Sequence, residues 1–227
     1  MITVLVVDDE AMTREILRDY LEADPTIEVV GEAADGETAV RQAQALGPDI
    51  ILMDMQMPGM DGVAATEAIH RAHPEVCILG MSTFTSDRYV VDLLRAGASG
   101  YLVKDTRPRD LRAAIAAAVA GESVLSPAVT RHVVAGLQES MRAVQPDPAL
   151  LEALTDKELQ VIQLLAEGMS NREMSDVLFI AESTVKARLV RIMTKLEVRD
   201  RVQILVSAMR HGLIDLTEPQ GRHAPQR

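Results

Sequence analysis

Short apolar segments alternate with amphipathic helical segments over residues 1–120, and this alternation constrains the fold more than any other feature. The apolar segments are four to six residues long, which is typical of buried strands. The predicted strands cover residues 3–7, 27–30, 50–53, 76–81 and 100–103. The predicted helices cover residues 14–21, 37–45, 64–72, 87–96 and 110–120. Five strands alternating with five helices predict an α/β domain with a doubly wound, five-stranded parallel sheet.

The strand at 50–53 is apolar throughout, as expected of a strand buried on both faces of a parallel sheet. Pro58, Gly59 and Gly62 then break the chain into a loop before the next helix. Asp54 therefore lies where this strand leaves the core at its carboxyl end, the edge at which open α/β sheets bind ligands. A single aspartate in such a place is more often a turn or cap residue.

Other strands of the predicted sheet also end in polar residues. Asp8 and Asp9 follow the first strand, Ser82 the fourth and Lys104 the fifth. Each has an ordinary explanation alone, as a cap, turn or solvated residue. Because parallel strands bring these ends to one edge, we expect them to converge on Asp54. Carboxylate oxygens gathered in this way suit Mg²⁺, while the ammonium and the hydroxyl suit phosphate oxygens.

No histidine in this group could activate water, so the predicted chemistry is acceptance of a phosphoryl group. The carboxylate at Asp54 would act as the nucleophile and become an aspartyl phosphate.

Charge divides the chain into two parts. The net charge of −11 comes from residues 1–124, with 21 acidic and 10 basic residues, whereas residues 125–227 carry 13 of each. Because the two parts differ in net charge, we expect two domains that bind different partners. The chain has no apolar run long enough for a membrane span and no basic leader, so we expect a cytoplasmic protein without membrane contact. The single Cys77 lies in an apolar segment and is expected to be a core residue.

Proline and serine mark the boundary between the domains. Ser126-Pro127 predicts the start of a helix over 126–142, and Pro146 and Pro148 end it. We therefore predict an α/β phosphoacceptor domain at 1–124, a linker with a helix at 125–149, a second domain at 150–216 and a disordered tail at 217–227.

The second domain is predicted to be small and all-α. Capping boxes at 155–158 and 170–173 begin two helices, and Gly168 ends the first of them. A third helix over 182–196 and a fourth over 200–211 follow. Two short helices joined by a tight turn and followed by a basic helix predict a helix-turn-helix.

The third helix buries one stripe and turns small and basic side chains outward. This arrangement suits base edges in the major groove with phosphates held at the flanks, although a solvated basic face has the same pattern. Ala187 and Val190 offer no polar base contacts, so thymine methyls and DNA shape would contribute to specificity. The residues predicted to contact DNA are Ser183, Thr184, Lys186, Ala187, Arg188, Val190, Arg191, Thr194 and Lys195.

The first domain resembles the receiver domains of response regulators. The matching motifs are VDDE at 7–10, MDMQMPGMDG at 53–62, the serine at 82 and GASGYLVK at 97–104. This resemblance implies that a sensor histidine kinase or a small phosphodonor phosphorylates Asp54. It also implies that Asp9, Asp54 and the Gln56 backbone carbonyl bind Mg²⁺, with Asp8 acting through water. Lys104 and Ser82 would hold the phosphoryl oxygens, and Tyr101 would turn inward as a switch.

The second domain resembles LuxR/NarL-type output domains, through LTDKE at 154–158, AEGMSNRE at 166–173, STVK at 183–186 and KLEV at 195–198. The resemblance implies promoter DNA as a partner, a homodimer after phosphorylation with the 200–210 helix available for pairing, and RNA polymerase as a further contact. Ala181 departs from the family, which usually has a capping serine or threonine there, a change worth roughly 1 kcal/mol.

The leading interpretation is a two-component transcription regulator that is not an enzyme beyond promoting its own phosphorylation and dephosphorylation. One alternative is a Mg²⁺-dependent phosphatase with an aspartyl intermediate, but that chemistry calls for a second acid at position 56, where the residue is Gln56. The other is a protein-interaction module that has lost DNA binding.

Overall fold

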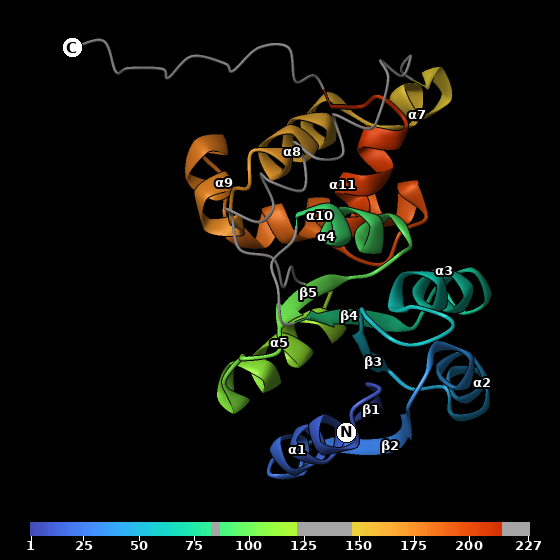
Figure 1. The fold of residues 1–227 in the computed structure, drawn as a ribbon. Helices are drawn as coiled ribbons and strands as arrows, with labels where there is room; N and C mark the ends of the chain where they lie inside the picture. Colours follow the sequence, from blue (N-terminus) through green and yellow to red (C-terminus); the bar gives the residue numbers. More distant parts are fainter. Residues whose placement is uncertain (83–86, 122–146, 215–227) are drawn as a thin grey trace.

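The computed structural model describes residues 1–82, 87–121 and 147–214, and Figure 1 shows its two domains. The N-terminal domain is built on a parallel sheet with the strand order β2-β1-β3-β4-β5. The strands are β1 (Ile2–Val7), β2 (Ile27–Ala33), β3 (Ile50–Asp54), β4 (Cys77–Ser82) and β5 (Gly100–Val103). The predicted doubly wound sheet is confirmed.

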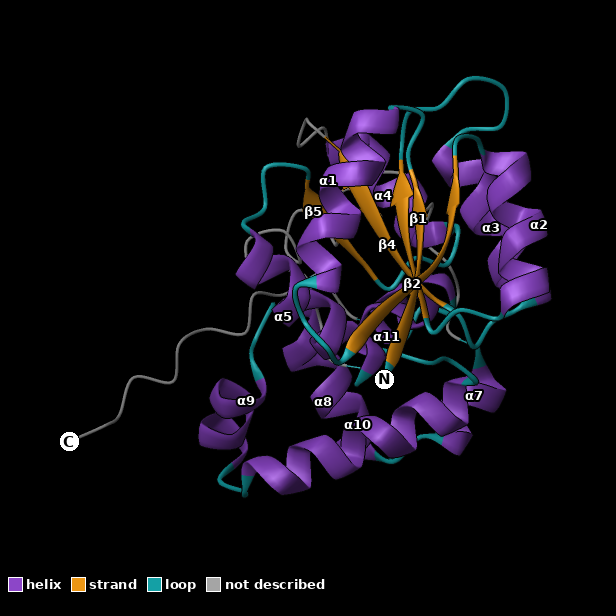
Figure 2. Cartoon of the chain, turned by 90° about the horizontal axis from the view of Figure 1, so that it is seen from below, coloured by secondary structure: helices purple, strands orange, loops and turns teal. Residues whose placement is uncertain are grey.

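Helices cover both faces of this sheet (Figure 2). They are α1 (Ala11–Glu22), α2 (Gly36–Leu46), α3 (Gly62–Ala72), α4 (Asp87–Arg95) and α5 (Pro108–Val119). Helices α1 and α5 pack on one face, where Leu17 and Leu111 join buried residues of β1, β3 and β4. Helices α2 and α3 pack on the other face through Ala39 and Ile69.

The central strand β3 is buried along its whole length, as its continuous apolar composition predicts. Cys77 starts the neighbouring strand β4 and is fully buried, so it is the predicted core residue. Burial raises the pKa of the Cys77 thiol to about 11, which keeps it protonated and unreactive at neutral pH.

Gly62 allows the loop after β3 to fold back onto the strand end. A β-carbon on Gly62 would lie 2.0 Å from the Asp54 carbonyl oxygen, closer than any side chain allows. The Gly62 backbone N–H donates to the Met55 carbonyl at 3.2 Å. Because the loop is held this closely, α3 begins immediately beside Asp54.

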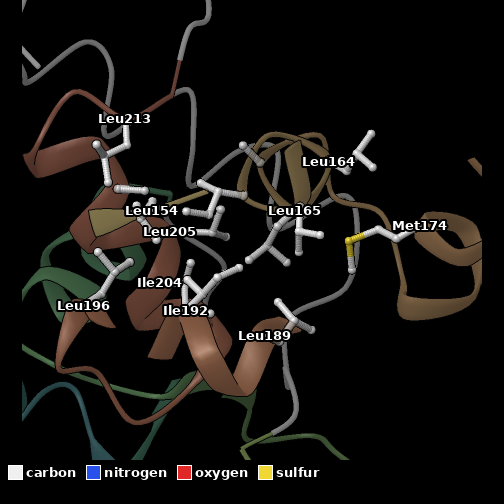
Figure 3. Packing of buried hydrophobic residues seen from close by; sticks show 14 of the residues in the cluster. Leu154, Leu164, Leu165, Met174, Leu189, Ile192, Leu196, Ile204, Leu205 and Leu213 are labelled. Atoms are coloured by element: carbon white, nitrogen blue, oxygen red, sulfur yellow. The ribbon is translucent and has the colours of Figure 1, made fainter. Parts of the chain in front are cut away.

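The C-terminal domain consists of helices packed around one apolar core (Figure 3). The helices are α7 (Pro148–Ala153), α8 (Asp156–Ala166), α9 (Asn171–Leu178), α10 (Glu182–Leu196) and α11 (Arg201–Arg210). Helix α10 has the predicted bounds. Its predicted inner stripe of Val185, Leu189, Ile192 and Leu196 is buried.

Among the described elements of this domain, the sequence interpretation missed helix α7. The Asp147 side chain accepts a hydrogen bond from the Ala149 backbone at 3.0 Å, and Pro148 occupies the first turn. Pro148, which the sequence interpretation expected only to end the preceding helix, therefore begins one. The predicted helix at 126–142 and the predicted tail at 217–227 lie outside the described residues.

Both predicted capping boxes are present. Thr155 and Glu158 cap each other at the start of α8, and Ser170 and Glu173 do so at the start of α9. At the start of α10, Ala181 makes no side-chain cap, as its lack of a hydroxyl predicts. None of the helices in the described ranges combines the length and the apolar character that a membrane span requires.

Candidate functional site

Two carboxylates and an ammonium group lie together at the carboxyl edge of the sheet. Lys104 Nζ is 2.7 Å from Asp8 Oδ2 and 3.1 Å from Asp54 Oδ1. Asp8 and Asp54 are buried, with 1% and 3% of their surface exposed. The structure thus brings together three side chains at the carboxyl ends of β1, β3 and β5, as the strand-end argument predicts.

Asp9 completes a group of carboxylates that fits a metal ion. Ligand oxygens of Asp8, Asp9 and Asp54 lie within 4.8 Å of one another, with Asp9 exposed and the other two buried. Oxygen ligands with one side open to water match the preference of Mg²⁺, which retains several waters when protein-bound. The residues present therefore fit the cation that the sequence suggests.

The electrostatics of this pocket favour a bound cation. Burial raises the pKa of the Asp54 carboxyl; the charge of Lys104 opposes this shift, and Asp8 reinforces it. Burial lowers the pKa of Lys104, but its contacts with Asp8 and Asp54 outweigh that effect and raise the pKa above its ordinary value. Lys104 is therefore an ammonium at neutral pH, and a second cation would stabilise the remaining negative charge.

The loop after β3 also contributes to the site. The Gln56 backbone N–H donates a hydrogen bond to the Asp54 carboxylate, which acts to lower the pKa of Asp54. The Gln56 side chain is exposed. The role of the Gln56 carbonyl as a metal ligand stays a prediction.

Ser82 and Tyr101 form a pair beside the acidic pocket. Ser82 ends β4, and Tyr101 lies on the adjacent strand β5 with only 7% of its surface exposed. Burial raises the pKa of the Tyr101 hydroxyl, and a hydrogen bond with Ser82 opposes this shift. The predicted switch residues are therefore in contact, and the Tyr101 side chain is buried.

Tyr101 belongs to an apolar cluster that joins the two domains, here called the seam. The receiver-side members are Met55, Val90, Val91, Leu93, Leu94, Ala98 and Tyr101, and the members from α11 are Val202, Val206 and Met209. The outer face of α11 is thus covered by the N-terminal domain. The sequence interpretation left this helix available for pairing, whereas in the structure it is already occupied.

Polar contacts fix the position of α11 on the seam. Gln203 Nε2 donates to the carbonyl oxygens of Leu94, at 3.1 Å, and Ala98, at 2.7 Å. Asp200 caps α11 by accepting from the Val202 and Gln203 backbone N–H groups, each at 2.9 Å. The neighbouring Arg199 guanidinium donates to a carbonyl oxygen of the N-terminal domain, at Glu75.

The outer face of α10, in contrast, is open. Seven of the nine residues predicted to contact DNA are exposed: Ser183, Thr184, Lys186, Ala187, Val190, Arg191 and Thr194. Arg188 is half-buried. The N-terminal domain therefore covers α11 and leaves the candidate recognition helix accessible.

Lys195, the ninth predicted DNA contact, has another partner in this structure. Its Nζ is 2.6 Å from Glu158 Oε2, and the Glu158 side chain is buried. Burial raises the pKa of Glu158, but hydrogen bonds from Lys195 and Thr155 outweigh it and hold the pKa at about 2. This ion pair joins α8 to α10, so a DNA contact by Lys195 stays a prediction.

Two residues of these sites were not singled out from the sequence. The capping box identified Glu158 as a cap but contained no information about a partner 37 residues away. Gln203 interrupts the apolar residues of α11, and a polar side chain in such a run was the available signal of a buried contact.

Two family models match the chain. Residues 4–116 match the response regulator receiver domain, and residues 152–208 match the luxR family of bacterial regulatory proteins. The first match contains the acidic pocket, and the second contains α8 to α10 with most of α11.

Relatives match the chain over nearly its full length. The transcriptional regulatory protein LiaR of Bacillus subtilis is 42% identical over 215 residues, which is 95% of this chain and 100% of that protein. The response regulator protein VraR of Staphylococcus aureus is 38% identical over 213 residues, or 94% and 99% of the two chains. A crystal structure of a LuxR-family two-component response regulator from Aurantimonas sp. SI85-9A1 is 32% identical, with a TM-score of 0.56 over 62% of this chain and 99% of that one.

Proposed function

Because the chain belongs to the response regulators that join a receiver domain to a LuxR-type DNA-binding domain, we propose that Asp54 is the phosphoacceptor controlling its output. The observation that carries this proposal is the contact of Lys104 with both Asp8 and Asp54 at the carboxyl edge of the sheet. A sensor histidine kinase, or a small phosphodonor, supplies the phosphoryl group.

In the proposed reaction, an oxygen of the Asp54 carboxylate attacks the donor phosphorus. The new bond joins this oxygen to phosphorus, the bond from phosphorus to the donor histidine nitrogen breaks, and the histidine leaves with the electron pair. The Lys104 ammonium lies within 3.1 Å of the Asp54 carboxylate, so it can pair with the phosphoryl oxygens with little movement. Ser82 donates its hydroxyl to the same oxygens.

Asp8, Asp9 and Asp54 are the proposed holders of the metal, with the Gln56 carbonyl as a further ligand. Bound there, Mg²⁺ would neutralise charge on the carboxylates and on the phosphoryl oxygens during transfer. The cluster of carboxylate oxygens supports this assignment, and the raised pKa of Asp54 indicates that the pocket alone does not balance its negative charge.

The path from Asp54 to the DNA-binding domain runs through Ser82 and Tyr101. If Ser82 turns toward a phosphoryl group, it leaves its hydrogen bond with Tyr101, and the ring repacks. Tyr101 shares the seam with Val202, Val206 and Met209 of α11. A small movement at the pocket therefore weakens the packing that holds α11.

Release of α11 would expose an apolar face that supports pairing with a second copy of the chain. The homodimer would place two copies of α10 on promoter DNA, where contact with RNA polymerase completes the proposed output. These partners place the protein in the cytoplasm. We assign it no enzymatic activity beyond promoting its own phosphorylation and dephosphorylation.

Mass spectrometry after incubation with acetyl phosphate and Mg²⁺ tests the acceptor. The wild-type chain should gain one phosphoryl group, and the Asp54→Asn variant should gain none. Asp105→Asn is a matched control, because Asp105 is an exposed acid next to Lys104 and outside the cluster, and it should be phosphorylated like wild type. Equal labelling of the Asp54→Asn chain would remove Asp54 from this role.

A second assay addresses the phosphatase alternative. A phosphatase would release inorganic phosphate from a phosphate ester over many turnovers, whereas the proposed function uses a phosphohistidine or a small phosphodonor and predicts no sustained turnover of an ester. Sustained release from p-nitrophenyl phosphate, abolished by Asp54→Asn, would favour the enzyme.

A further inference from the structure

Phe179 has two features that the fold itself does not require. It ends α9 in the left-handed conformation, with φ 52° and ψ 43°, and its backbone N–H donates to the Ser175 carbonyl. Its side chain is 95% exposed, more than any other large hydrophobic residue in the described part of the chain.

Both features oppose stability. Glycine and asparagine suit the left-handed position at a helix end, whereas a bulky β-carbon substituent disfavours it. An exposed ring also keeps its apolar surface in water. The described residues leave this ring uncovered, so a ligand outside the chain is the natural explanation for a phenylalanine here.

The position of Phe179 indicates which ligand this is. Only Ile180 and the N-cap residue Ala181 separate it from α10, whose first three residues, Glu182, Ser183 and Thr184, are all exposed. In a helix-turn-helix, the N-terminal part of the recognition helix contacts the base edges. Figure 2 shows α9 leading directly into the long α10, so the turn that carries Phe179 lies at this end of the helix.

The surroundings of Phe179 favour DNA over a protein partner. The adjoining face of α10 carries the exposed residues Lys186 and Arg191, and its exposed apolar residues are the small Ala187 and Val190, the latter at 56%. A protein-docking surface normally presents a contiguous apolar patch. A single aromatic ring next to a basic helix instead suits the thymine methyls and deoxyriboses of a duplex, which are the apolar parts of a charged ligand.

We infer that Phe179 is a DNA-contacting residue whose ring packs against thymine methyls or deoxyriboses at the N-terminal end of α10. This inference rests on the proposed DNA-binding function and adds a contact from the turn that precedes the recognition helix. A contact between the Phe179 ring and thymine methyls would also favour particular DNA sequences, as the apolar Ala187 and Val190 on the outward side of α10 are expected to do.

The test compares the Phe179→Asn variant with the wild-type full chain, both phosphorylated with acetyl phosphate and Mg²⁺. The probe is a duplex that the wild-type protein selects from a random-sequence pool. Asparagine accepts the left-handed conformation, so the variant should melt at the same temperature as wild type or higher. Its dissociation constant should nevertheless rise roughly tenfold, the effect of losing one buried aromatic contact.

Salt dependence separates this contact from a phosphate contact. Phe179→Asn should leave the slope of log K against log salt unchanged, whereas Lys186→Ala should reduce the slope by about one. Val177→Ala is the matched control, because Val177 is an exposed apolar residue two positions earlier on α9, and it should bind like wild type.

Unchanged affinity of the Phe179→Asn chain would overturn the inference, and so would normal DNA binding with lost transcription, because a protein partner would then be indicated. Failure of the proposed DNA-binding function is a separate outcome, in which the wild-type chain selects no duplex from the pool.

Discussion

The two buried faces of α11 have similar composition but different surroundings. On one face, Ile204, Leu205 and Ala208 lie in the core of the DNA-binding domain. On the other, Val202, Val206 and Met209 lie in the seam against the receiver domain. All six are buried to at least nine-tenths. Burial alone therefore does not distinguish a permanent core from a contact between domains.

Polar groups do distinguish the two faces. Four of the eight buried side-chain polar atoms without a well-formed hydrogen bond in the described residues lie around the seam: His70 Nδ1, Ser99 Oγ, Arg199 Nε and Asp200 Oδ2. Arg199 Nε and Asp200 Oδ2 form only a long ion pair with each other, at 4.0 Å. In the DNA-binding domain, the buried Glu158 is paired with Lys195 and Thr155. Buried polar groups with weak partners destabilise a contact, because they would make better hydrogen bonds with water. The seam is therefore suited to opening, and the domain core is not.

The largest expected effect is a difference between two substitutions on α11. Leu205→Ala should lower the free energy of unfolding of the DNA-binding domain by roughly 2–5 kcal/mol, because it leaves a cavity in the core. Met209→Ala, which removes a similar side chain from the seam, should affect that domain far less and weaken the contact between domains. Hydrogen exchange of the α8 and α10 amides reports the domain alone. Equal effects would mean that the seam is part of the domain core.

The Glu158–Lys195 pair should make the DNA-binding domain sensitive to acid. Because the pKa of Glu158 is lowered from 4.5 to about 2, its contribution is complete above pH 4.5 and is lost as the pH falls toward 2. The contribution is at most about 3 kcal/mol. Glu158→Gln should therefore lower the unfolding free energy at pH 7 and have little effect near pH 2. A pH-independent difference would show that the pair is not the cause.

Gln203 should hold the two domains together without stabilising either one. Gln203→Leu removes both hydrogen bonds to the receiver carbonyls and should shift the docking equilibrium by roughly 1–2 kcal/mol toward the open form. NMR relaxation can detect this shift, because undocked domains tumble faster and independently. An unchanged tumbling rate would show that the seam does not depend on this side chain.

Ser99 should have the smallest effect. Its hydroxyl is buried at the seam without a well-formed hydrogen bond, so Ser99→Ala should leave docking unchanged or tighten it by no more than about 0.5 kcal/mol. The same relaxation measurement applies. A clear shift toward undocked domains would mean that the Ser99 hydroxyl makes a stabilising hydrogen bond at the seam.

Local patterns predicted most of the fold and the acidic pocket. Strand-end positions placed Asp8, Asp54 and Lys104 together, because parallel strands bring their carboxyl ends to one edge. The capping boxes and the buried stripe of α10 were equally local signals. The seam was not predictable in this way, because the amphipathic pattern of α11 marks apolar faces without identifying what covers them. The partner of Lys195 was missed for the same reason, because the spacing of residues along one helix does not predict an ion pair with another helix.

The most direct test of the account measures DNA affinity before and after phosphorylation. Full-length wild-type and Asp54→Asn chains are titrated onto the selected duplex, with and without acetyl phosphate and Mg²⁺, and mass spectrometry records the phosphorylated fraction. The account predicts tighter binding only for the wild-type chain, and only in the phosphorylated samples. A fully phosphorylated wild-type chain with unchanged affinity, or an equal gain in the Asp54→Asn chain, would contradict it.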